Sequence, residues 1–196
     1  MTGSERRQQL IEVAKSLFAE RGFDATSIEE IAQRANVSKP VVYEHFGGKE
    51  GLYAVVVDRE MSMLLDRITA SLTENRSRVR IERVAMALLT YVEERTDGFR
   101  ILIRDSPAGT TSGTYASLLN DAVNQVASIL AGDFSRRGLD PELAPLYAQA
   151  LVGSVSMTAQ WWLDVREPPK EVVAAHVVNV VWNGLTHLEA NPELED

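Results

Sequence analysis

The sequence predicts an all-α protein with about nine helices, divided into an N-terminal three-helix helix-turn-helix domain over residues 1–48 and a larger helical domain over residues 49–196. Three observations lead to this fold class. Apolar residues recur three and four positions apart along most of the chain, which is the period of a helix with one buried face. Serine, threonine, proline and glycine mark the helix ends. Near the N-terminus, two short helices follow one another across a tight turn, the layout of a helix-turn-helix.

The first helix is expected between Arg6 and Glu20. Its apolar residues share one face, and they are Leu10, Ala14, Leu17 and Phe18. Gly22 follows, and glycine is the usual residue at a left-handed helix end.

The second helix is short, about two turns long, and its start carries a capping pattern. Thr26 and Glu29 are three residues apart and precede an apolar run, which is typical of a capping box. The run itself consists of Ile28, Ile31, Ala32 and Ala35. Asn36 and Val37 then form a tight turn.

A third helix begins at Ser38, a good capping residue, with Pro40 tolerated in its first turn, and it ends at Gly47-Gly48. At 100° per residue, Val42 and Phe46 share the buried side. The opposite side holds Pro40, Val41 and Glu44, flanked by Tyr43 and His45.

This surface has the arrangement of a helix that reads duplex DNA. In a major groove, the outer face of a helix meets base edges and its flanks meet the two phosphate strands. Thr26 and Lys49 stand at helix N-termini, where free backbone N–H groups and the helix dipole favour a phosphate. Each residue also has an ordinary interpretation: Thr26 as a cap, His45 as a packing residue, Tyr43 as a cover over apolar surface, Lys39 and Lys49 as solvated lysines. Their joint placement favours DNA binding.

Residues 7–52 resemble the DNA-binding domain of the TetR family of bacterial transcriptional repressors. The resemblance lies in "LFAERGFDATSIEEIAQRANVSKPVVYEHFGGKEGL", which spaces the characteristic residues as the family does. These residues are Gly22, Thr26, Ile31-Ala32, Ser38, Tyr43, His45, Phe46, Lys49 and Leu52. The resemblance implies that DNA is contacted by Thr26, Ser38, Lys39, Pro40, Tyr43, His45 and Lys49. Val41 and Glu44 complete the predicted DNA face, and Glu44 either accepts from a cytosine amino group or repels wrong sites.

Composition agrees with a globular protein and excludes several other classes. Apolar residues make up 45% of the 196 residues and charged residues 24%. There is no cysteine, so disulfides, thiolate metal sites and cysteine nucleophiles are excluded. No apolar run of about 18 residues indicates a membrane span, and "MTGSERRQQL" lacks the apolar stretch of a signal peptide, so a cytoplasmic location is expected.

The formal net charge of −8 alone argues against nucleic-acid binding. However, residues 1–50 hold seven Lys/Arg and eight Asp/Glu, and residues 51–196 hold thirteen and twenty. The acidity therefore lies mostly in the C-terminal part, and the average says little about one face of the N-terminal part.

The rest of the chain is also predicted to be helical. A fourth helix should run from Lys49 to Leu72, and "DSPAGTTSG" should be a loop. The other helices are expected at about Arg78–Glu94, Gly98–Arg104, Thr114–Phe134, Pro141–Val165 and Pro169–Ala190.

Apolar residues surround most of the circumference of the last two helices. A surface helix of a monomer shows a single apolar stripe, so these helices need cover on two sides. Either both are central to a large core, or a second subunit covers them. We expect a homodimer, as the resemblance also implies, with an interface at Leu151, Val155, Val173, Val177, Val181 and Leu185.

Large, soft apolar residues in the C-terminal domain suggest a place for a small apolar or aromatic ligand. They are Met86, Tyr91, Phe99, Leu102, Trp161 and Trp162, and the alternative for each is plain core packing.

No catalytic motif is present, the three histidines do not share a metal-binding pattern, and no cofactor is predicted. The sequence therefore predicts a sequence-specific transcriptional regulator rather than an enzyme. It would bind palindromic operator DNA as a homodimer, act as a repressor, and be released by a small-molecule effector, with no membrane partner. The alternative is a helical small-molecule-binding or scaffold protein that has lost specific DNA reading.

Overall fold

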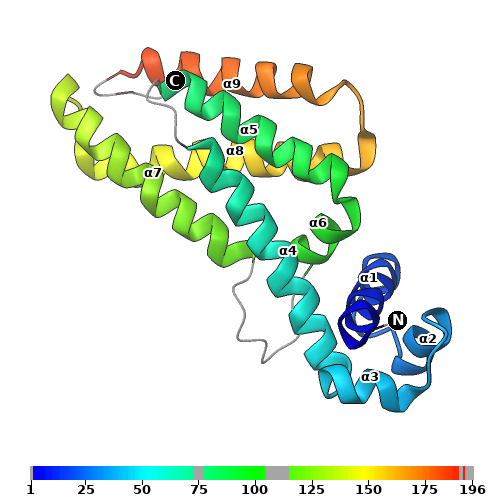
Figure 1. The fold of residues 1–196 in the computed structure, drawn as a ribbon. Coiled ribbons are helices and arrows are strands. Elements are labelled where there is room, and N and C mark those ends of the chain that lie inside the picture. The colour runs from blue at the N-terminus through cyan, green and yellow to red at the C-terminus, as the bar shows by residue number, and fades with distance from the viewer. Residues whose placement is uncertain (1, 73–76, 105–114, 190–191, 193–196) are drawn as a thin grey trace. The chain divides into compact units, whose positions relative to one another are not determined.

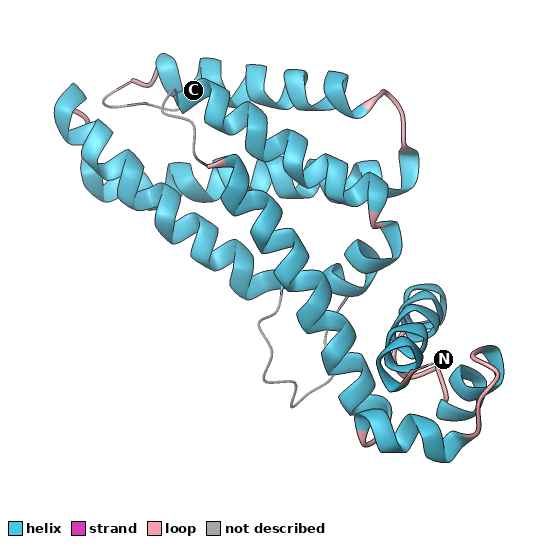
Figure 2. Cartoon of the chain, in the orientation of Figure 1, coloured by secondary structure: helices cyan, strands magenta, loops and turns pink. Residues whose placement is uncertain are grey.

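The computed structural model describes residues 2–72, 77–104, 115–189 and 192. Within these ranges the chain consists of helices and the loops that join them, without any strand (Figure 2). The predicted all-α class is confirmed. The predicted loop "DSPAGTTSG" lies outside the described residues.

Every helix expected from the sequence is present, with ends that differ by a few residues. In the described part of the chain the α-helices are α1 Gly3–Arg21, α2 Ile28–Arg34, α3 Lys39–Phe46, α4 Lys49–Ser71, α5 Ser77–Glu94, α6 Thr96–Ile103, α7 Tyr115–Arg137, α8 Ala144–Val165 and α9 Lys170–Thr186 (Figure 1). The segment Pro141–Leu143 is a separate 3₁₀ turn before α8, capped by the Asp140 side chain, which accepts from Glu142 N at 2.9 Å.

The chain forms two compact units. Unit 1 comprises residues 1–66 and 94–115, and therefore holds α1 to α3, most of α4, and α6. Unit 2 comprises residues 67–93 and 116–196, with nearly all of α5 and α7 together with α8 and α9. The domain boundary predicted after residue 48 falls within unit 1.

The core of unit 1 forms around α1. The helical spacing predicted for this helix puts its apolar face inside, and Leu10, Ala14 and Leu17 are completely buried. An aromatic cluster closes one end, where the rings of Phe18 and Phe23 each meet the Tyr53 ring of α4 at 5.0 Å. Burial of this apolar area is what fixes α1 against α4.

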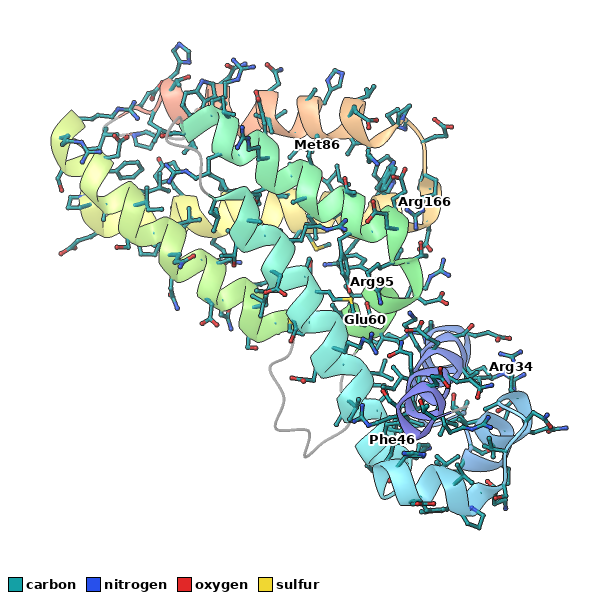
Figure 3. The ribbon with its side chains drawn as sticks, in the orientation of Figure 1. Arg34, Phe46, Glu60, Met86, Arg95 and Arg166 are labelled. Atoms are coloured by element: carbon teal, nitrogen blue, oxygen red, sulfur yellow. The ribbon has the colours of Figure 1, made fainter. Side chains whose placement is uncertain are left out.

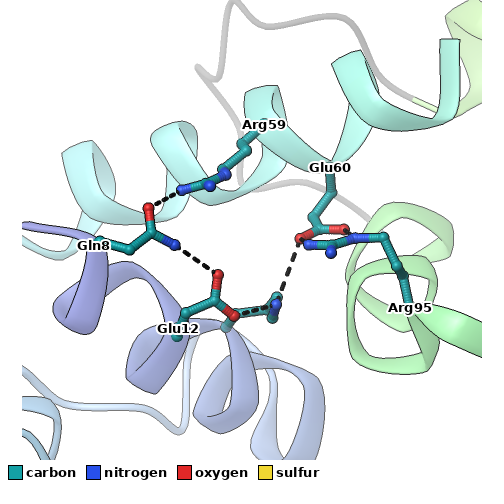
Figure 4. A network of polar contacts seen from close by, with 6 residues as sticks. Gln8, Glu12, Arg59, Glu60 and Arg95 are labelled. Carbon is teal, nitrogen blue, oxygen red and sulfur yellow. Dashed lines mark hydrogen bonds and ion pairs between the residues drawn. The ribbon is translucent and has the colours of Figure 1, made fainter. Parts of the chain in front are cut away.

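A buried carboxylate also joins α1, α4 and the start of α6. Glu60 of α4 is only 2% exposed, and Arg95, the residue before α6, grips both of its oxygens, with Nε donating to Oε2 at 2.8 Å (Figures 3 and 4). Lys15 of α1 lies 3.7 Å from the same carboxylate. Two cations from different elements therefore neutralise one buried negative charge, as a buried charge requires.

Further polar contacts extend this network along α1. Lys15 also pairs with Glu12, which accepts from Gln8 at 3.0 Å, and Gln8 in turn accepts from Arg59 of α4 (Figure 4). Just beyond the other end of α6, Arg104 Nη1 donates to the carbonyl of Phe18 at 2.9 Å. Both ends of α6 are thus tied to α1, one through Glu60 and one directly.

In unit 2, α8 and α9 pack against each other along faces rich in alanine and valine. Their connection is held by polar contacts: Trp162 Nε1 donates to the Pro168 carbonyl at 2.8 Å, and Arg166 Nη2 donates to the Val92 carbonyl of α5 at 3.1 Å. Lys170 at the start of α9 pairs with Glu93. The last turn of α5 is therefore bound to the α8–α9 connection.

Gly98 is predicted to be essential for the Glu60 pair. A Cβ at this position would overlap Glu60 Oε2 and lie 2.6 Å from Cδ. We expect Gly98→Ala to lower the free energy of unfolding by about 1–3 kcal/mol, because the carboxylate must leave Arg95 or α6 must shift. Thermal or urea unfolding measures the change.

Gly132→Ala in α7 is the matched control. Its Cβ would meet only the end of the Arg136 side chain, at 3.8 Å, so the substitution should stabilise the chain by up to about 1 kcal/mol. Equal effects of the two substitutions would contradict the role given to Gly98.

Candidate nucleic-acid interface

The turn between α2 and α3 depends on Asn36. This residue has a φ of 53°, in the left-handed region, which asparagine tolerates better than most residues. The turn brings Val37 N within 2.9 Å of the Ala32 carbonyl, which accepts its hydrogen bond. The chain reverses here, and α3 follows as the second helix of a helix-turn-helix.

The cap of α2 is one residue later than predicted. Ser27 is the N-cap, and its hydroxyl accepts from Glu30 N at 3.2 Å. The prediction that Thr26 caps this helix is wrong, because the Thr26 hydroxyl is buried and donates to the Gly22 carbonyl at 2.7 Å. The segment "TSIEE" contains two overlapping capping patterns, and the later one is used.

This finding changes what the start of α2 presents to the outside. DNA contact by Thr26 stays a prediction, and its hydroxyl is engaged within the chain by the Gly22 carbonyl. The exposed hydroxyl at this point belongs to Ser27. Sequence reasoning missed Ser27, although the serine three residues before Glu30 was a signal for it.

Helix α3 begins and ends as expected. Ser38 is its N-cap, without a side-chain capping hydrogen bond, and Pro40 lies in the first turn. Gly47 ends the helix with a φ of 73°, and its N–H donates to the Tyr43 carbonyl at 2.8 Å. Glycine is favoured here because the left-handed conformation is strained for other residues.

The two sides of α3 are those read from the sequence. Val42 is completely buried and Phe46 is half-buried, with the Arg7 guanidinium 5.0 Å above the Phe46 ring. On the outer side, Tyr43 is 53% exposed. The other residues of the predicted DNA face range from exposed to half-buried: Ser38, Lys39, Pro40 and Glu44 are exposed, and Val41 and His45 are half-buried.

Two cations at or near this surface are close to carboxylates, Lys39 on α3 and Arg34 on α2. Lys39, at the first position of α3, forms an ion pair with Glu29 in the first turn of α2. The Lys39 ammonium, as hydrogen-bond donor, holds the pKa of Glu29 below its ordinary value. Arg34 at the end of α2 lies 3.6 Å from Glu20 of α1.

Lys49 faces inward rather than outward. Its Nζ donates to the Phe23 carbonyl at 2.9 Å and lies 4.3 Å from the centre of the Phe23 ring. The ammonium therefore holds the loop between α1 and α2 against the start of α4. Its predicted contact with DNA phosphate is not tested by these contacts.

A close approach of backbones fixes the end of α3 against the start of α4. A Cβ on Gly51 would overlap the carbonyl oxygen of Phe46 and lie 3.2 Å from its carbonyl carbon. Only glycine allows this approach, so the direction of α3 follows from that of α4. This role of Gly51 was not predicted from the sequence.

The residues predicted for a dimer interface fall into two groups. Val173 and Val181 are 5% and 8% exposed and thus belong to the core of unit 2 itself. Leu151, Val155, Val177 and Leu185 are half-buried. The exposed apolar side chains of α8 and α9 are different ones: Leu146, Met157, Trp161, Val165, Val172 and Val180.

The residues predicted for a ligand pocket are divided between the units. Phe99 and Leu102 are buried in unit 1, with the Phe99 ring edge-on to Tyr115 at 5.6 Å. In unit 2, Met86 is half-buried, Tyr91 and Trp162 are buried, and Trp161 is 51% exposed. The indole N–H of Trp162 is already used by Pro168.

Two family models match the chain. The model described as "Bacterial regulatory proteins, tetR family" matches residues 10–56, which contain the helix-turn-helix. The model described as "Tetracyclin repressor-like, C-terminal domain" matches residues 77–184, more than half of the chain. The chain belongs to the TetR family.

Named relatives of this TetR-family chain include both an activator and a repressor of transcription. It is 32% identical over 189 residues to the HTH-type transcriptional activator FasR of Mycolicibacterium smegmatis, covering 94% of this chain and 84% of FasR. It is 27% identical over 195 residues to the HTH-type transcriptional repressor KstR2 of Rhodococcus jostii, covering 93% of this chain and 92% of KstR2.

Solved structures of the family share the fold. A TetR-like transcriptional regulator from Rhodococcus superposes with a TM-score of 0.77 at 25% identity, over 92% of this chain and 96% of that one. A tetR-family transcriptional regulator from Streptomyces coelicolor superposes with a TM-score of 0.63 at 32% identity, over 95% of this chain and 82% of that one.

This TetR-family chain is therefore a helix-turn-helix transcriptional regulator and not an enzyme, and regulators of this family bind operator DNA. None of the helices in the described ranges is long and apolar enough to cross a membrane. Nor do three His, Asp or Glu side chains gather as for a metal ion anywhere in the described residues.

The inward position of Lys49 predicts an effect on stability. Lys49→Met keeps the aliphatic stem but removes the ammonium, so it should lower the free energy of unfolding by about 1–2 kcal/mol. Lys39→Met is the control, because its exposed ion pair should contribute at most about 1 kcal/mol. Thermal unfolding of both variants compares them, and a larger loss for Lys39→Met would contradict this assignment.

Proposed function

We propose that this regulator binds a palindromic operator as a homodimer, with α3 of each subunit in the major groove, and represses transcription until a small apolar or aromatic ligand releases it. The observation that carries the DNA-binding part is the two-sided character of α3. Val42 anchors the helix in the unit, while Pro40, Tyr43 and Glu44 stand exposed on the outer side. A helix in a major groove needs this combination.

The exposed groups of α3 suit particular parts of DNA. The Tyr43 hydroxyl and a His45 ring nitrogen can donate to phosphates, as can the Ser38 hydroxyl, which makes no capping bond. Val41 can contact a thymine methyl, and Glu44 can accept from a cytosine amino group. In this proposal Lys39 binds phosphate, while Thr26 holds the segment before α2 to the Gly22 carbonyl and Lys49 holds the α1–α2 loop to the start of α4.

A second copy of the chain would cover the outer side of α8 and α9. Six large apolar side chains are exposed there, among them Met157 at 62% and Val180 at 72%. Large apolar side chains exposed on two helices that pack against each other suit an interface between subunits. A two-fold dimer would present two α3 helices to half-sites one or more turns of DNA apart.

The proposed effector binds in unit 2, whose helices carry soft and aromatic side chains such as Met86 and Tyr91. An apolar site with few polar groups suits a small apolar or aromatic molecule. Such a ligand acts as an inducer only if it binds the DNA-free arrangement more tightly than the DNA-bound one, since equal affinity shifts nothing.

Repression is the proposed outcome of operator binding, as the name of KstR2 indicates for that relative. Activation is the second candidate, because FasR, at 32% identity, is named as an activator. A promoter carrying the bound sequence, fused to a reporter, distinguishes the two: deletion of the regulator raises expression in the first case and lowers it in the second.

Selection of DNA from a random pool by the full chain tests the proposal as a whole. Enrichment of a single palindromic sequence, bound by two chains, is the expected result. Binding without sequence preference, or a selected site without two-fold symmetry, would overturn it.

Tyr43→Ala should weaken binding to the selected DNA by roughly 1–3 kcal/mol, since a positioned contact is lost. Tyr43→Phe isolates the hydroxyl and should account for about 0.5–1.5 kcal/mol of this loss. Fluorescence anisotropy with labelled duplex measures both. If Tyr43→Ala bound DNA with unchanged affinity and unfolded like the wild type, the proposal that α3 contacts DNA would be contradicted.

Val180→Asp should convert the dimer into monomer or aggregate, because a carboxylate without a partner in an apolar interface costs several kcal/mol. The control is Ile129→Asp in α7, which replaces another exposed apolar residue outside the proposed interface and should leave the dimer intact. Light scattering at micromolar concentration gives the masses, and a monomeric wild type would contradict the proposal.

A further inference from the structure

Helix α3 carries a single lysine or arginine, Lys39, and this cation already forms an ion pair with Glu29. In "KPVVYEHF" only Lys39 is permanently positive, and its ammonium is bound by the Glu29 carboxylate. The pair connects the first turn of α2 to the first turn of α3. Both side chains are more than half exposed, at 51% for Lys39 and 60% for Glu29, and Lys39 belongs to the predicted DNA face.

The surroundings do not supply a surplus of positive charge. Residues 1–50 hold seven Lys/Arg against eight Asp/Glu. Arg21 pairs with Glu30, and Arg34 lies near Glu20. Because phosphate binding draws on the charge of lysine and arginine, a duplex approaching this surface meets cations that are already partly neutralised.

We propose that Glu29 competes with DNA phosphate for the Lys39 ammonium, and so limits both the affinity of the recognition helix for DNA and its dependence on salt. This inference rests on the proposed function, in which α3 enters the major groove. Within it, Glu29 is a residue that sets affinity rather than one that contacts a base.

The exchange follows from the position of the pair. An exposed ion pair contributes little to folding, so Lys39 can leave Glu29 without loss of the fold. On binding, the ammonium moves to a phosphate and the carboxylate remains beside the DNA strand, where it is repelled. The lowered pKa of Glu29 agrees with its engagement by Lys39 in the DNA-free protein.

Glu29→Gln in the full chain tests the proposal. Glutamine keeps the shape of the side chain and removes its charge, so the wild-type-selected duplex should be bound about two- to five-fold more tightly at low salt. The plot of log affinity against log salt should become steeper by up to about one unit, because Lys39 then counts as a full phosphate contact.

Glu30→Gln is the matched control for the overall change of charge. It alters the neighbouring residue of the same helix turn, which pairs with Arg21 rather than with Lys39. If Glu29 acted only through the net charge of the unit, the two variants would bind alike. We expect Glu29→Gln to have the clearly larger effect.

A double-mutant cycle with Lys39→Met tests the mechanism. The gain from Glu29→Gln should largely disappear in the Lys39→Met background, because the competed cation is absent. A gain that persists there, equal effects of Glu29→Gln and Glu30→Gln, or weaker binding by Glu29→Gln would each overturn the proposal. Failure of the proposed function itself is distinguishable, because the wild-type chain would then select no duplex.

Discussion

The arrangement of unit 1 depends on one buried carboxylate. Glu60 can remain charged inside the unit only because cations from two other elements reach it: Lys15 from α1 and Arg95 from the start of α6. Losing one partner of such a pair would leave a poorly compensated buried charge, which costs about 3–5 kcal/mol. The absence of a side chain at Gly98 lets α6 come close enough for the contact. Three helices from distant parts of the sequence are in this way held to a single geometry.

Arg95 lies just after the point at which the chain passes from unit 2 to unit 1. The last turn of α5 is held within unit 2, where Val92 accepts from Arg166 and Glu93 pairs with Lys170. Arg95 follows two residues after Glu93 and is held within unit 1 by Glu60. The short stretch 92–95 therefore joins contacts within unit 2 to contacts within unit 1 along the chain.

Local patterns predicted the helices well, and contacts between distant residues were beyond them. Apolar residues three and four positions apart predicted that Val42 lies on the buried side of α3 and Tyr43 on the exposed side, because such a helix buries only one face. The spacing of Thr26 and Glu29 predicted a cap at Thr26, but the Thr26 hydroxyl donates to the Gly22 carbonyl and Ser27 caps the helix instead. The inward turn of Lys49 onto Phe23, and the close approach of Gly51 to Phe46, join residues whose meeting depends on the tertiary fold. Likewise, the burial of Val173 and Val181 depends on the tertiary packing of unit 2, which the apolar circumference of α9 alone does not determine.

The connection of α6 to α1 also bears on how hybrid regulators can be built. A hybrid joined directly after the helix-turn-helix would give α1 a foreign α4 and α6, and would separate Lys15 from Glu60 and the Phe18 carbonyl from Arg104. The part that can be transplanted intact is not one continuous segment. It consists of α1 to α3 with the first part of α4, together with the separate α6 segment beginning at Arg95. Recombination that exchanged only the first of these pieces would leave Glu60 without its contact to Arg95, and α1 without its contact to Arg104.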